Sequence, residues 1–195
     1  MRGIIYNNVF LYQAAMRAIY GRDFKIRYEA VASNIEKGWS VLDLCCGDCH
    51  IAKFLDKSVS YEGMDFNEVF LKRAKRNGIK ASFRDLKKGP GIERKFDCVM
   101  MMGSLHQFSP EEDRILDVMK KAALKRIIVS EPCRNIVSSG NKYLAFLAKV
   151  VSNPGNDRIS EIKRFTREDI MDIFRRHAVA RVIDAGKDLI GIFDL

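Results

Sequence analysis

The chain has 195 residues, of which 47% are hydrophobic and 30% are charged, a balance that excludes a disordered or fibrous protein. Its formal net charge of +9 raises the question of a polyanionic partner. No apolar run approaches the length of a membrane span, no secretory signal is evident, and the five cysteines are an odd number. We therefore expect a soluble, cytoplasmic protein of one domain, residues 1–195, with free thiols.

Residues 1–38 precede the first predicted strand and carry apolar residues at helical spacing, such as Tyr12, Met16 and Ile19. We expect these residues to form an N-terminal helical cap. Open α/β sheets bind ligands at the carboxyl ends of their strands, where residues 1–20 are expected to lie.

Seven short apolar runs rich in β-branched residues predict seven β-strands. They are Ser40–Leu44, Val59–Met64, Ile79–Phe83, Phe96–Met102, Arg126–Ser130, Val179–Ile183 and Asp188–Phe193. Helical spacing predicts helices over Cys49–Leu55, Asn67–Arg76, Pro110–Ala123 and Thr166–Arg176. Strands and helices in alternation predict a doubly wound α/β fold, in which helices cover both faces of a mostly parallel sheet.

Local signals refine the ends of these elements. Ser109 is a candidate N-cap with Pro110 at the first helical position, and Thr166 is a candidate N-cap for the last helix. Only residues 185–187 separate the last two strands, which is too few for a crossover helix and predicts a hairpin. An antiparallel strand therefore closes the sheet.

Residues 133–165 form a predicted insertion between the fifth strand and the following helix. They include an apolar stripe over Tyr143–Val151. We expect residues 138–152 to cover the binding site together with the N-terminal cap, and Phe146 and Leu147 to lie within reach of the pocket.

The most informative stretch is Val41–His50, in which a buried strand runs through a tight turn into a helix. Asp43 lies near the end of that strand, and the second strand ends at Asp65, about twenty residues further on. In doubly wound folds an acid at the end of the second strand accepts hydrogen bonds from both hydroxyls of a ribose. Asp65 is therefore a candidate ribose-binding residue.

Together these features resemble the class I S-adenosylmethionine-dependent methyltransferases. The first motif of that family reads roughly apolar-apolar-Asp-x-Gly-x-Gly-x-Gly, and its glycine positions here hold Cys45, Gly47 and Cys49. Residues 96–106 and 127–132 look like the family's fourth-strand and fifth-strand motifs. The resemblance implies a Rossmann-like, seven-stranded sheet with strand order 3-2-1-4-5-7-6 and an antiparallel last strand.

The resemblance also implies S-adenosylmethionine as the cofactor. Asp85 would then hold the adenine amine, and Gly47 with the adjoining turn would hold the methionine part. The candidate cofactor-binding residues are Asp43, Leu44, Cys45, Gly47, Asp65, Phe66, Asp85, Leu86 and Met102. A Cβ at either cysteine of the turn can crowd the methionine part, because glycine lets the backbone approach a ligand closely.

His106 is the candidate catalytic residue. It follows the predicted fourth strand where the resembled family often has a histidine beside the acceptor, and residues 103–106 would border the transferred methyl group. A neutral imidazole can take a proton from the nucleophile. The alternative is a histidine that only shapes the pocket, because an activated methyl group often needs no base.

Cysteine chemistry offers two other interpretations of the turn. Cys46–His50 fits the Cys-x-x-Cys-His pattern of c-type haem attachment, and Cys45, Cys46, Cys49 and His50 are in principle zinc ligands. Haem attachment belongs to exported proteins, and structural zinc sites usually use two separated pairs of ligands, so we expect no metal. NAD is a distant second cofactor, because the Gly-x-Gly-x-x-Gly fingerprint is missing.

The acceptor is the open question. Residues 70–95 contain ten Lys or Arg against two acids, which favours RNA, but they lack the interleaved aromatic residues that stack on bases. Cys133 follows the fifth strand, as a nucleophilic cysteine does in RNA cytosine methyltransferases, yet no Pro-Cys follows the fourth strand. We expect methyl transfer to a small-molecule or lipid-like acceptor. RNA methylation and a non-catalytic adenosylmethionine-binding protein are the alternatives.

Overall fold

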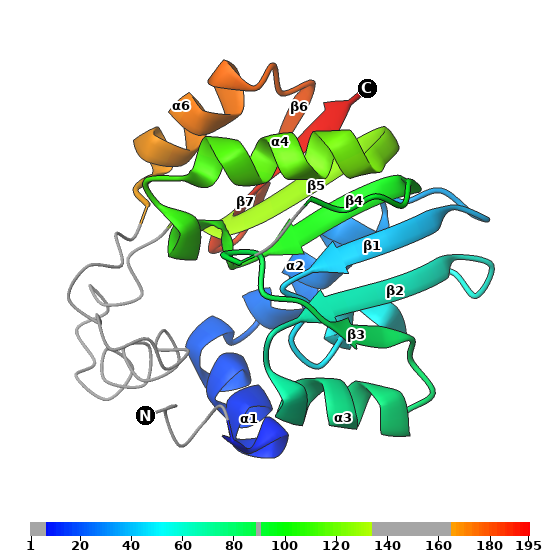
Figure 1. Ribbon diagram of the computed structural model, residues 1–195. Coiled ribbons are helices and arrows are strands. Elements are labelled where there is room, and N and C mark those ends of the chain that lie inside the picture. Colours follow the sequence, from blue (N-terminus) through cyan, green and yellow to red (C-terminus); the bar gives the residue numbers. More distant parts are fainter. Residues whose placement is uncertain (1–6, 89–90, 134–164) are drawn as a thin grey trace.

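The computed structural model describes residues 7–88, 91–133 and 165–195, which form one mixed sheet of seven strands (Figure 1). The strands are β1 (Ser40–Leu44), β2 (Ser60–Asp65), β3 (Ala81–Phe83), β4 (Phe96–Met102), β5 (Ala123–Pro132), β6 (Arg181–Ala185) and β7 (Asp188–Asp194). Their order in the sheet is β3-β2-β1-β4-β5-β7-β6. The predicted fold class and strand order are confirmed.

The central strand β1 runs parallel to β2 on one side and to β4 on the other, and β5 continues the parallel part beyond β4. β7 runs antiparallel to both β5 and β6, so the predicted hairpin is confirmed. The pairing of β5 with β7 places Asp188 opposite Pro132. The start of β7 therefore lies at the same sheet edge as the carboxyl ends of the parallel strands.

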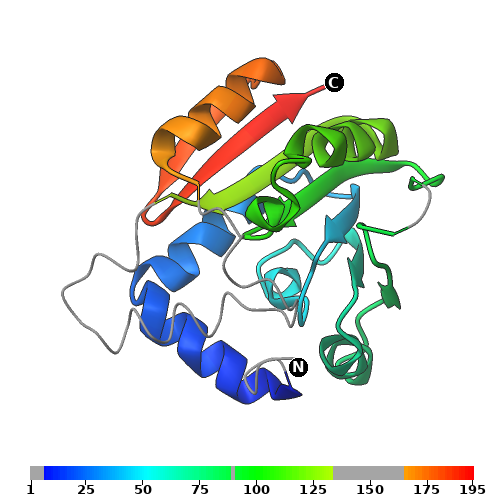
Figure 2. The ribbon, with the colours of Figure 1, turned by 60° about the vertical axis from the view of Figure 1, so that its left-hand side comes forward.

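Helical segments cover both faces of the sheet. Those in the described residues are α1 (Val9–Tyr20), α2 (Asp23–Ala32), η2 (His50–Lys53), α3 (Glu68–Arg76), η3 (Leu105–Phe108), α4 (Glu112–Ala122) and α6 (Arg167–Arg176). Leu42 of β1 packs in one core cluster with Leu116 of α4 and Phe174 of α6, whereas Val41 packs in a second cluster with Val31 of α2. Neighbouring residues of a strand point to opposite faces, which explains this alternation. Figure 2 shows α4 and α6 together on one face.

The predicted helix over Cys49–Leu55 is wrong in type and length. The structure has only one 3₁₀ turn, His50–Lys53, after Cys49 in the left-handed conformation. A left-handed residue cannot belong to a right-handed helix, so the helical turn begins only at His50. Soon afterwards Asp56 accepts hydrogen bonds from the backbone and side chain of Ser58 and fixes a new turn, so no room remains for a longer helix.

The two predicted helix caps differ in outcome. Thr166 caps α6 as expected, and its side chain and that of Asp169 form a reciprocal capping box. The prediction for Ser109 and Pro110 is wrong: their peptide bond is cis, α4 begins only at Glu112, and the N-cap residue Glu111 makes no side-chain capping bond. Two acidic residues, Glu112 and Asp113, lie in the first turn of α4.

The predicted cover of the binding site lies mostly outside the described residues. The stripe over 143–151, with Phe146 and Leu147, lies outside them, as does most of the predicted insertion. Within the described ranges, no helix combines the length and apolar character needed to cross a membrane.

Candidate functional site

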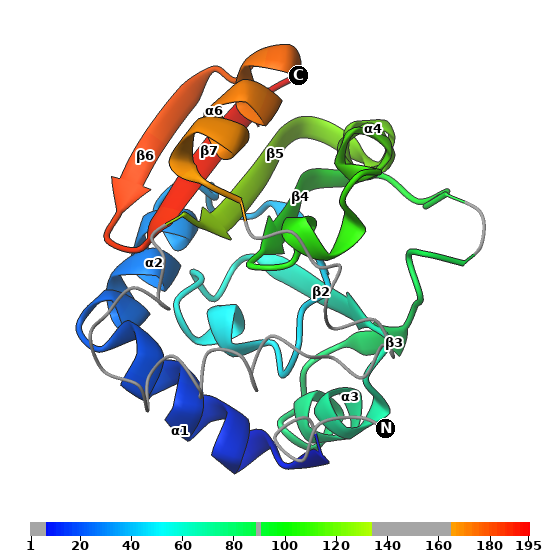
Figure 3. The same cartoon turned by 90° about the vertical axis from the view of Figure 1, so that its left-hand side faces the viewer.

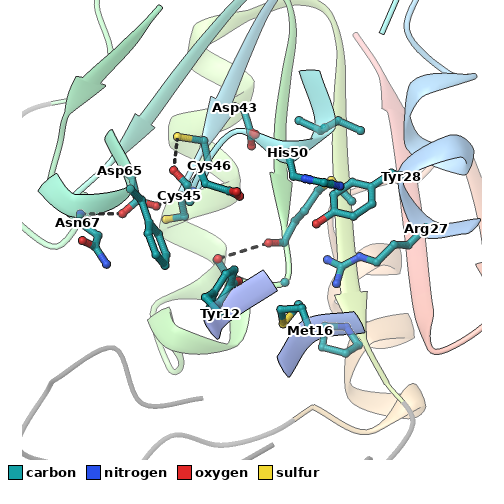
Figure 4. Close-up of a pocket in the computed structure, with 18 of the residues that line it drawn as sticks. Tyr12, Met16, Arg27, Tyr28, Asp43, Cys45, Cys46, His50, Asp65 and Asn67 are labelled. Atoms are coloured by element: carbon teal, nitrogen blue, oxygen red, sulfur yellow. Dashed lines mark hydrogen bonds between the residues drawn. The ribbon is translucent and has the colours of Figure 1, made fainter. Parts of the chain in front are cut away.

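A pocket lies at the carboxyl ends of β1, β2 and β4, on the sheet edge that faces the viewer in Figure 3. Its walls come from α1, α2, the turn after β1, the end of β2 and the residues after β4. Figure 4 shows side chains from these elements pointing toward one another. Residues from sequence positions 12 to 132 therefore meet in one place, as expected for a ligand site of an open α/β sheet.

The turn after β1 keeps the backbone of a three-glycine loop although two of its glycines are cysteines. Cys45, Gly47 and Cys49 have φ angles of 57°, 56° and 59°, so all three lie in the left-handed region. This region favours glycine, and a non-glycine residue there carries backbone strain. The sequence therefore forms the glycine-type turn despite the two replacements, and Cys45 and Gly47 line the pocket.

Cys49 does not crowd the pocket, because its side chain is fully buried on the β2 side of the turn. The Sγ atoms of Cys46 and Cys49 lie 3.4 Å apart, and each would lie 2.7 Å from a Cβ on Gly63. Gly63 in β2 thus provides the space that the two sulfurs fill. Of the two cysteines at glycine positions, Cys45 lines the pocket and Cys49 does not. Burial raises the pKa of the Cys45 thiol.

The geometry of the turn also bears on the haem and zinc interpretations. The His50 ring lies among the rings of Phe24, Tyr28 and Phe54, at centroid distances of 5.1 to 5.8 Å, and burial lowers its pKa to about 4. The Cys46 thiol is hydrogen-bonded to the thiol of Cys49 and is buried, and both effects raise its pKa. In the described part of the chain, no three His, Cys, Asp or Glu side chains are grouped so that they could hold a metal ion.

Asp65, at the end of β2, is buried and accepts two main-chain hydrogen bonds. Its Oδ2 accepts from the backbone N–H of Gly47 at 2.8 Å, and its Oδ1 accepts from that of Asn67 at 2.7 Å. The carboxylate therefore joins the turn after β1 to the start of α3.

Asp43 lies beside this turn with one carboxylate oxygen unused. Tyr61 donates its hydroxyl to Oδ2 at 2.7 Å, while Oδ1 is buried and has no hydrogen-bond partner in the described residues. Burial raises the pKa of Asp43 to about 7, because the charged form loses its hydration. An unpaired buried carboxylate oxygen in a ligand pocket suits a cationic group of a ligand.

His106, on η3, is held by a buried carboxylate. Its Nδ1 lies 2.9 Å from Oε2 of Glu131, and Oε1 of Glu131 accepts a hydrogen bond from the backbone N–H of Leu105. Glu131 is fully buried at the end of β5, while His106 lines the pocket. A carboxylate on Nδ1 favours the proton on that nitrogen, which leaves Nε2 as the acceptor.

The first helix is fastened to the pocket at two points. The Gln13 side-chain amide donates to the Asp48 carboxylate at 2.9 Å, and the rings of Tyr12 and Phe70 lie 4.9 Å apart. Tyr12 and Met16 line the pocket. Figure 3 shows α1 between α2 and α3, beside the carboxyl ends of the strands.

Most, but not all, of the predicted site residues meet in the pocket. The lining includes His106 and six of the nine candidate cofactor residues: Asp43, Cys45, Gly47, Asp65, Phe66 and Met102. Leu44 is buried in the core, and Leu86 packs against that core. Asp85 is part-exposed, and its Oδ1 accepts a hydrogen bond from the backbone N–H of Lys87. None of these three side chains lines the pocket.

Sequence reasoning missed two acids and an arginine of this site. Glu131 appears only inside the fifth-strand motif, and Arg27 and Asp188 belong to no motif at all. The three come from β5, α2 and β7, more than fifty residues apart along the chain. The sequence signal that could have identified these three residues is their charge. Each lies in or beside an apolar run, and a charged side chain that is buried requires a partner.

Comparison with known proteins agrees with this geometry. A family described as "Methyltransferase domain" matches residues 41–125. The fold is similar to that of magnesium protoporphyrin IX methyltransferase from Synechocystis PCC 6803 with bound SAH, at 18% identity over 97% of this chain and 96% of that one, with a TM-score of 0.61. No curated protein matches the sequence.

Two further structures share the fold. A SAM-dependent methyltransferase from Thermotoga maritima is 14% identical over 97% of this chain and 96% of that one, with a TM-score of 0.66. A methyltransferase in complex with the Haloferax volcanii activator Trm112 is 13% identical over 98% and 97%, with a TM-score of 0.67.

Residues 41–125 match a methyltransferase domain, and the sheet has the strand order that the resemblance to class I S-adenosylmethionine-dependent methyltransferases implied. The resemblance drawn from the sequence motifs is thereby confirmed. This chain departs from the motif of that family by carrying cysteines at two positions of the glycine turn, and Gly63 leaves room for the second.

Proposed function

We propose that the protein transfers a methyl group from S-adenosylmethionine to a small-molecule or lipid-like acceptor, with His106 as the general base. The observation that carries this proposal is the His106–Glu131 pair, since His106 lines the same pocket as the glycine-type turn and Asp65, and Glu131 holds it from behind. A base is required only when the attacking atom carries a proton. The proposed acceptor group is therefore a hydroxyl, an amine or an acidic carbon.

The pocket suits the cofactor in three respects. Gly47 brings main chain to the pocket, the Asp65 carboxylate lines it at the end of β2, where it would face the ribose hydroxyls, and Asp43 has a buried oxygen without a partner in the described residues for a cationic group. Phe66 and Met102 complete the proposed cofactor site. When bound, S-adenosylmethionine supplies a methyl group activated by a sulfonium. The proposed roles of Leu44, Asp85 and Leu86 rest on the family resemblance alone.

The protein's own contribution to the reaction is alignment and proton transfer. Glu131 keeps the proton on Nδ1 of His106 and fixes the ring, so that Nε2 receives the proton of the acceptor. The buried surroundings of the pair exclude water from this step. An imidazolium formed in this way is stabilised by the buried carboxylate.

The nature of the acceptor is inferred from the lining. Met16, Ile19 and Tyr20 of α1 contribute apolar and aromatic surface to the pocket, which favours an acceptor with an apolar part. RNA is less favoured, since Lys80 and Arg94 of the basic segment are paired with Glu62.

A labelling experiment tests the proposal. The purified protein is incubated with methyl-labelled S-adenosylmethionine and, separately, with small-molecule extract, lipid extract and total RNA. We expect label in the small-molecule or lipid fraction, and labelling about 10²-fold slower or more with the His106→Ala variant. Label in RNA alone would overturn the proposed acceptor class. Failure of the wild-type protein to bind S-adenosylhomocysteine would overturn the proposed cofactor site.

A further inference from the structure

Two thiols face each other in the turn after β1. The thiol of Cys49 donates a hydrogen bond to that of Cys46, and the two Sγ atoms lie 3.4 Å apart. The S–S bond of a disulfide is about 2.05 Å long, so the two sulfurs have to approach by roughly 1.4 Å to form one. The pair is therefore close to bonding distance in the folded protein.

The backbone between the two cysteines has the shape that a disulfide needs. The N–H of Cys49 donates to the carbonyl of Cys46 at 2.9 Å, which closes a four-residue turn, and Gly47 inside the turn has a φ of 56°. The end residues of a β-turn have Cα atoms less than about 7 Å apart, and disulfides join Cα atoms about 4.4–6.8 Å apart. Closure of the bond therefore requires little movement of the main chain.

Strand β2 provides the space for this closure. A Cβ on Gly63 would lie 2.7 Å from the Sγ of Cys46 and equally close to that of Cys49, so both sulfurs lie directly over the glycine. Because Gly63 has no side chain, the two sulfurs can turn toward each other without a clash at this residue.

The two thiols differ in exposure. Cys46 is part-exposed and lines the pocket next to Cys45 (Figure 4), whereas Cys49 is fully buried. A small reagent in the pocket therefore reaches Cys46 first, and Cys49 lies behind it. The hydrogen bond with Cys49 and burial raise the pKa of the Cys46 thiol, and since the thiolate is the reactive form, we expect a slow reaction that is faster at alkaline pH.

We propose that Cys46 and Cys49 are a redox-active pair, which a small organic disulfide oxidises to a Cys46–Cys49 disulfide. The Cys46 thiolate attacks one sulfur of the reagent, the S–S bond of the reagent breaks, and one thiol leaves. The Cys49 thiolate then attacks the Sγ of Cys46 in the mixed disulfide and releases the second thiol. The two cysteines lose two electrons and two protons, and the two released thiols carry both.

The disulfide would fasten the turn in its glycine-type conformation. Cys45 and Cys49 hold left-handed φ angles of 57° and 59°, which are strained for residues other than glycine. A cross-link between Cys46 and Cys49 reduces the freedom of the unfolded chain and so favours the folded turn. The pair thus couples the stability of this turn to the balance of thiols and disulfides around the protein. It needs no cofactor and is independent of the proposed function.

Peptide mapping tests the proposal. The folded, full-length protein is equilibrated with mixtures of 2-mercaptoethanol and its disulfide, unfolded in N-ethylmaleimide and digested with trypsin. One tryptic peptide, residues 38–53, contains Cys45, Cys46 and Cys49. The experiment therefore uses Cys45→Gly, which leaves two cysteines in this peptide and restores glycine at a left-handed position. We expect no maleimide on the peptide after oxidation and two after treatment with dithiothreitol.

A matched variant and a second measurement sharpen the result. In Cys45→Gly/Cys49→Ala the resolving thiol is missing, so Cys46 should keep 2-mercaptoethanol as a mixed disulfide. Oxidised Cys45→Gly should unfold at a higher urea concentration than its reduced form, and Cys45→Gly/Cys49→Ala should show no such rise. Should Cys45→Gly not fold, Cys45→Ala provides the same two-cysteine peptide.

Three results would overturn the proposal. Two maleimides on the peptide at every ratio of thiol to disulfide would show that the pair does not close. A bond that forms only in urea concentrations that unfold the protein would show that the folded turn does not bring the sulfurs together. An unfolding midpoint that does not rise on oxidation would exclude the fastening of the turn.

Discussion

The two ends of the pocket are built by different means. At the end proposed to bind the ribose, Asp65 accepts hydrogen bonds from the backbone N–H groups of Gly47 and Asn67, and three left-handed residues shape the turn. At the other end, buried side chains contact one another: His106 with Glu131, and Arg27 with Asp188. The first end depends on main-chain conformation, which tolerates changes of side chain. The second end depends on pairs of charged side chains, and the loss of one partner leaves the other buried without a partner.

The largest effect is expected at the side-chain end. His106→Ala should lower kcat by about 10²–10⁴-fold, because the proton acceptor is lost, while the affinity for S-adenosylhomocysteine stays within about twofold. Single-turnover kinetics and calorimetry measure the two quantities. His177→Ala is the control, since that imidazole contacts Asp113 and Lys120 at the far end of α6. A loss below about threefold would reassign His106 to a structural role.

Glu131 acts through His106 and so requires a different measurement. Glu131→Gln should alter the pH profile of kcat as well as its magnitude, because an amide no longer stabilises the imidazolium. A purely structural role would lower stability and leave the pH profile unchanged.

The two ends of the pocket also differ in how far the sequence predicts them. The sequence predicts that the turn, Asp43 and Asp65 meet at one site because their places follow from local order: a strand, a tight turn and an acid about twenty residues on. The pairing of Arg27 with Asp188 joins residues that are far apart in the chain and depends on β7 lying beside β5. No local pattern encodes that neighbourhood.

The failed predictions of local structure have the same origin. The helical spacing of Cys49–Leu55 is present, yet the left-handed Cys49 of the preceding turn shortens the helix to one 3₁₀ turn. The crowding expected from Cys49 is relieved by Gly63, which lies fourteen residues away in β2. In the first case the backbone conformation of the adjoining turn overrides the helical spacing, and in the second a tertiary contact supplies the space.

Asp43 provides the next largest effect, in the pH dependence of stability. Its pKa is raised by burial to about 7, above its ordinary value of 3.8, so the folded state binds more protons than the unfolded state between these values. The free energy of unfolding should therefore fall as the pH rises from about 4 to 7, by up to about 4 kcal/mol, and then level off. Urea unfolding of the ligand-free protein at a series of pH values measures this. Asp43→Asn should flatten the curve; an unchanged curve would contradict the assignment.

At the ribose end, Asp65→Ala should weaken S-adenosylhomocysteine binding tenfold or more, because it removes an acceptor for two backbone N–H groups and for the ribose hydroxyls. Asp65→Asn keeps one oxygen and should lose less. Asp56→Ala is the control: Asp56 also accepts a backbone N–H, but in an exposed turn away from the pocket. Calorimetry showing equal affinity in folded Asp65→Ala would remove the main support for the ribose site.

The smallest effect concerns the compensation for the cysteines of the turn. A Cβ on Gly63 would lie 2.7 Å from the Sγ atoms of both Cys46 and Cys49, so Gly63→Ala should reduce the free energy of unfolding. Overpacking of this kind typically costs about 1–3 kcal/mol. Urea unfolding measures the loss, and Gly91→Ala, where nothing lies within 4 Å of the added Cβ, should leave stability nearly unchanged.

A mutant cycle shows whether the sulfurs cause that loss. In a Cys46→Ala/Cys49→Gly background both Sγ atoms are absent, and Gly63→Ala should then lose less than half of what it loses in the wild-type protein. The remaining loss reflects the Cβ of residue 46, which lies 3.1 Å from the added atom. An equal loss in both backgrounds would mean that Gly63 is required by the strand itself. The cysteines of the turn would then need another explanation for how they fit beside β2.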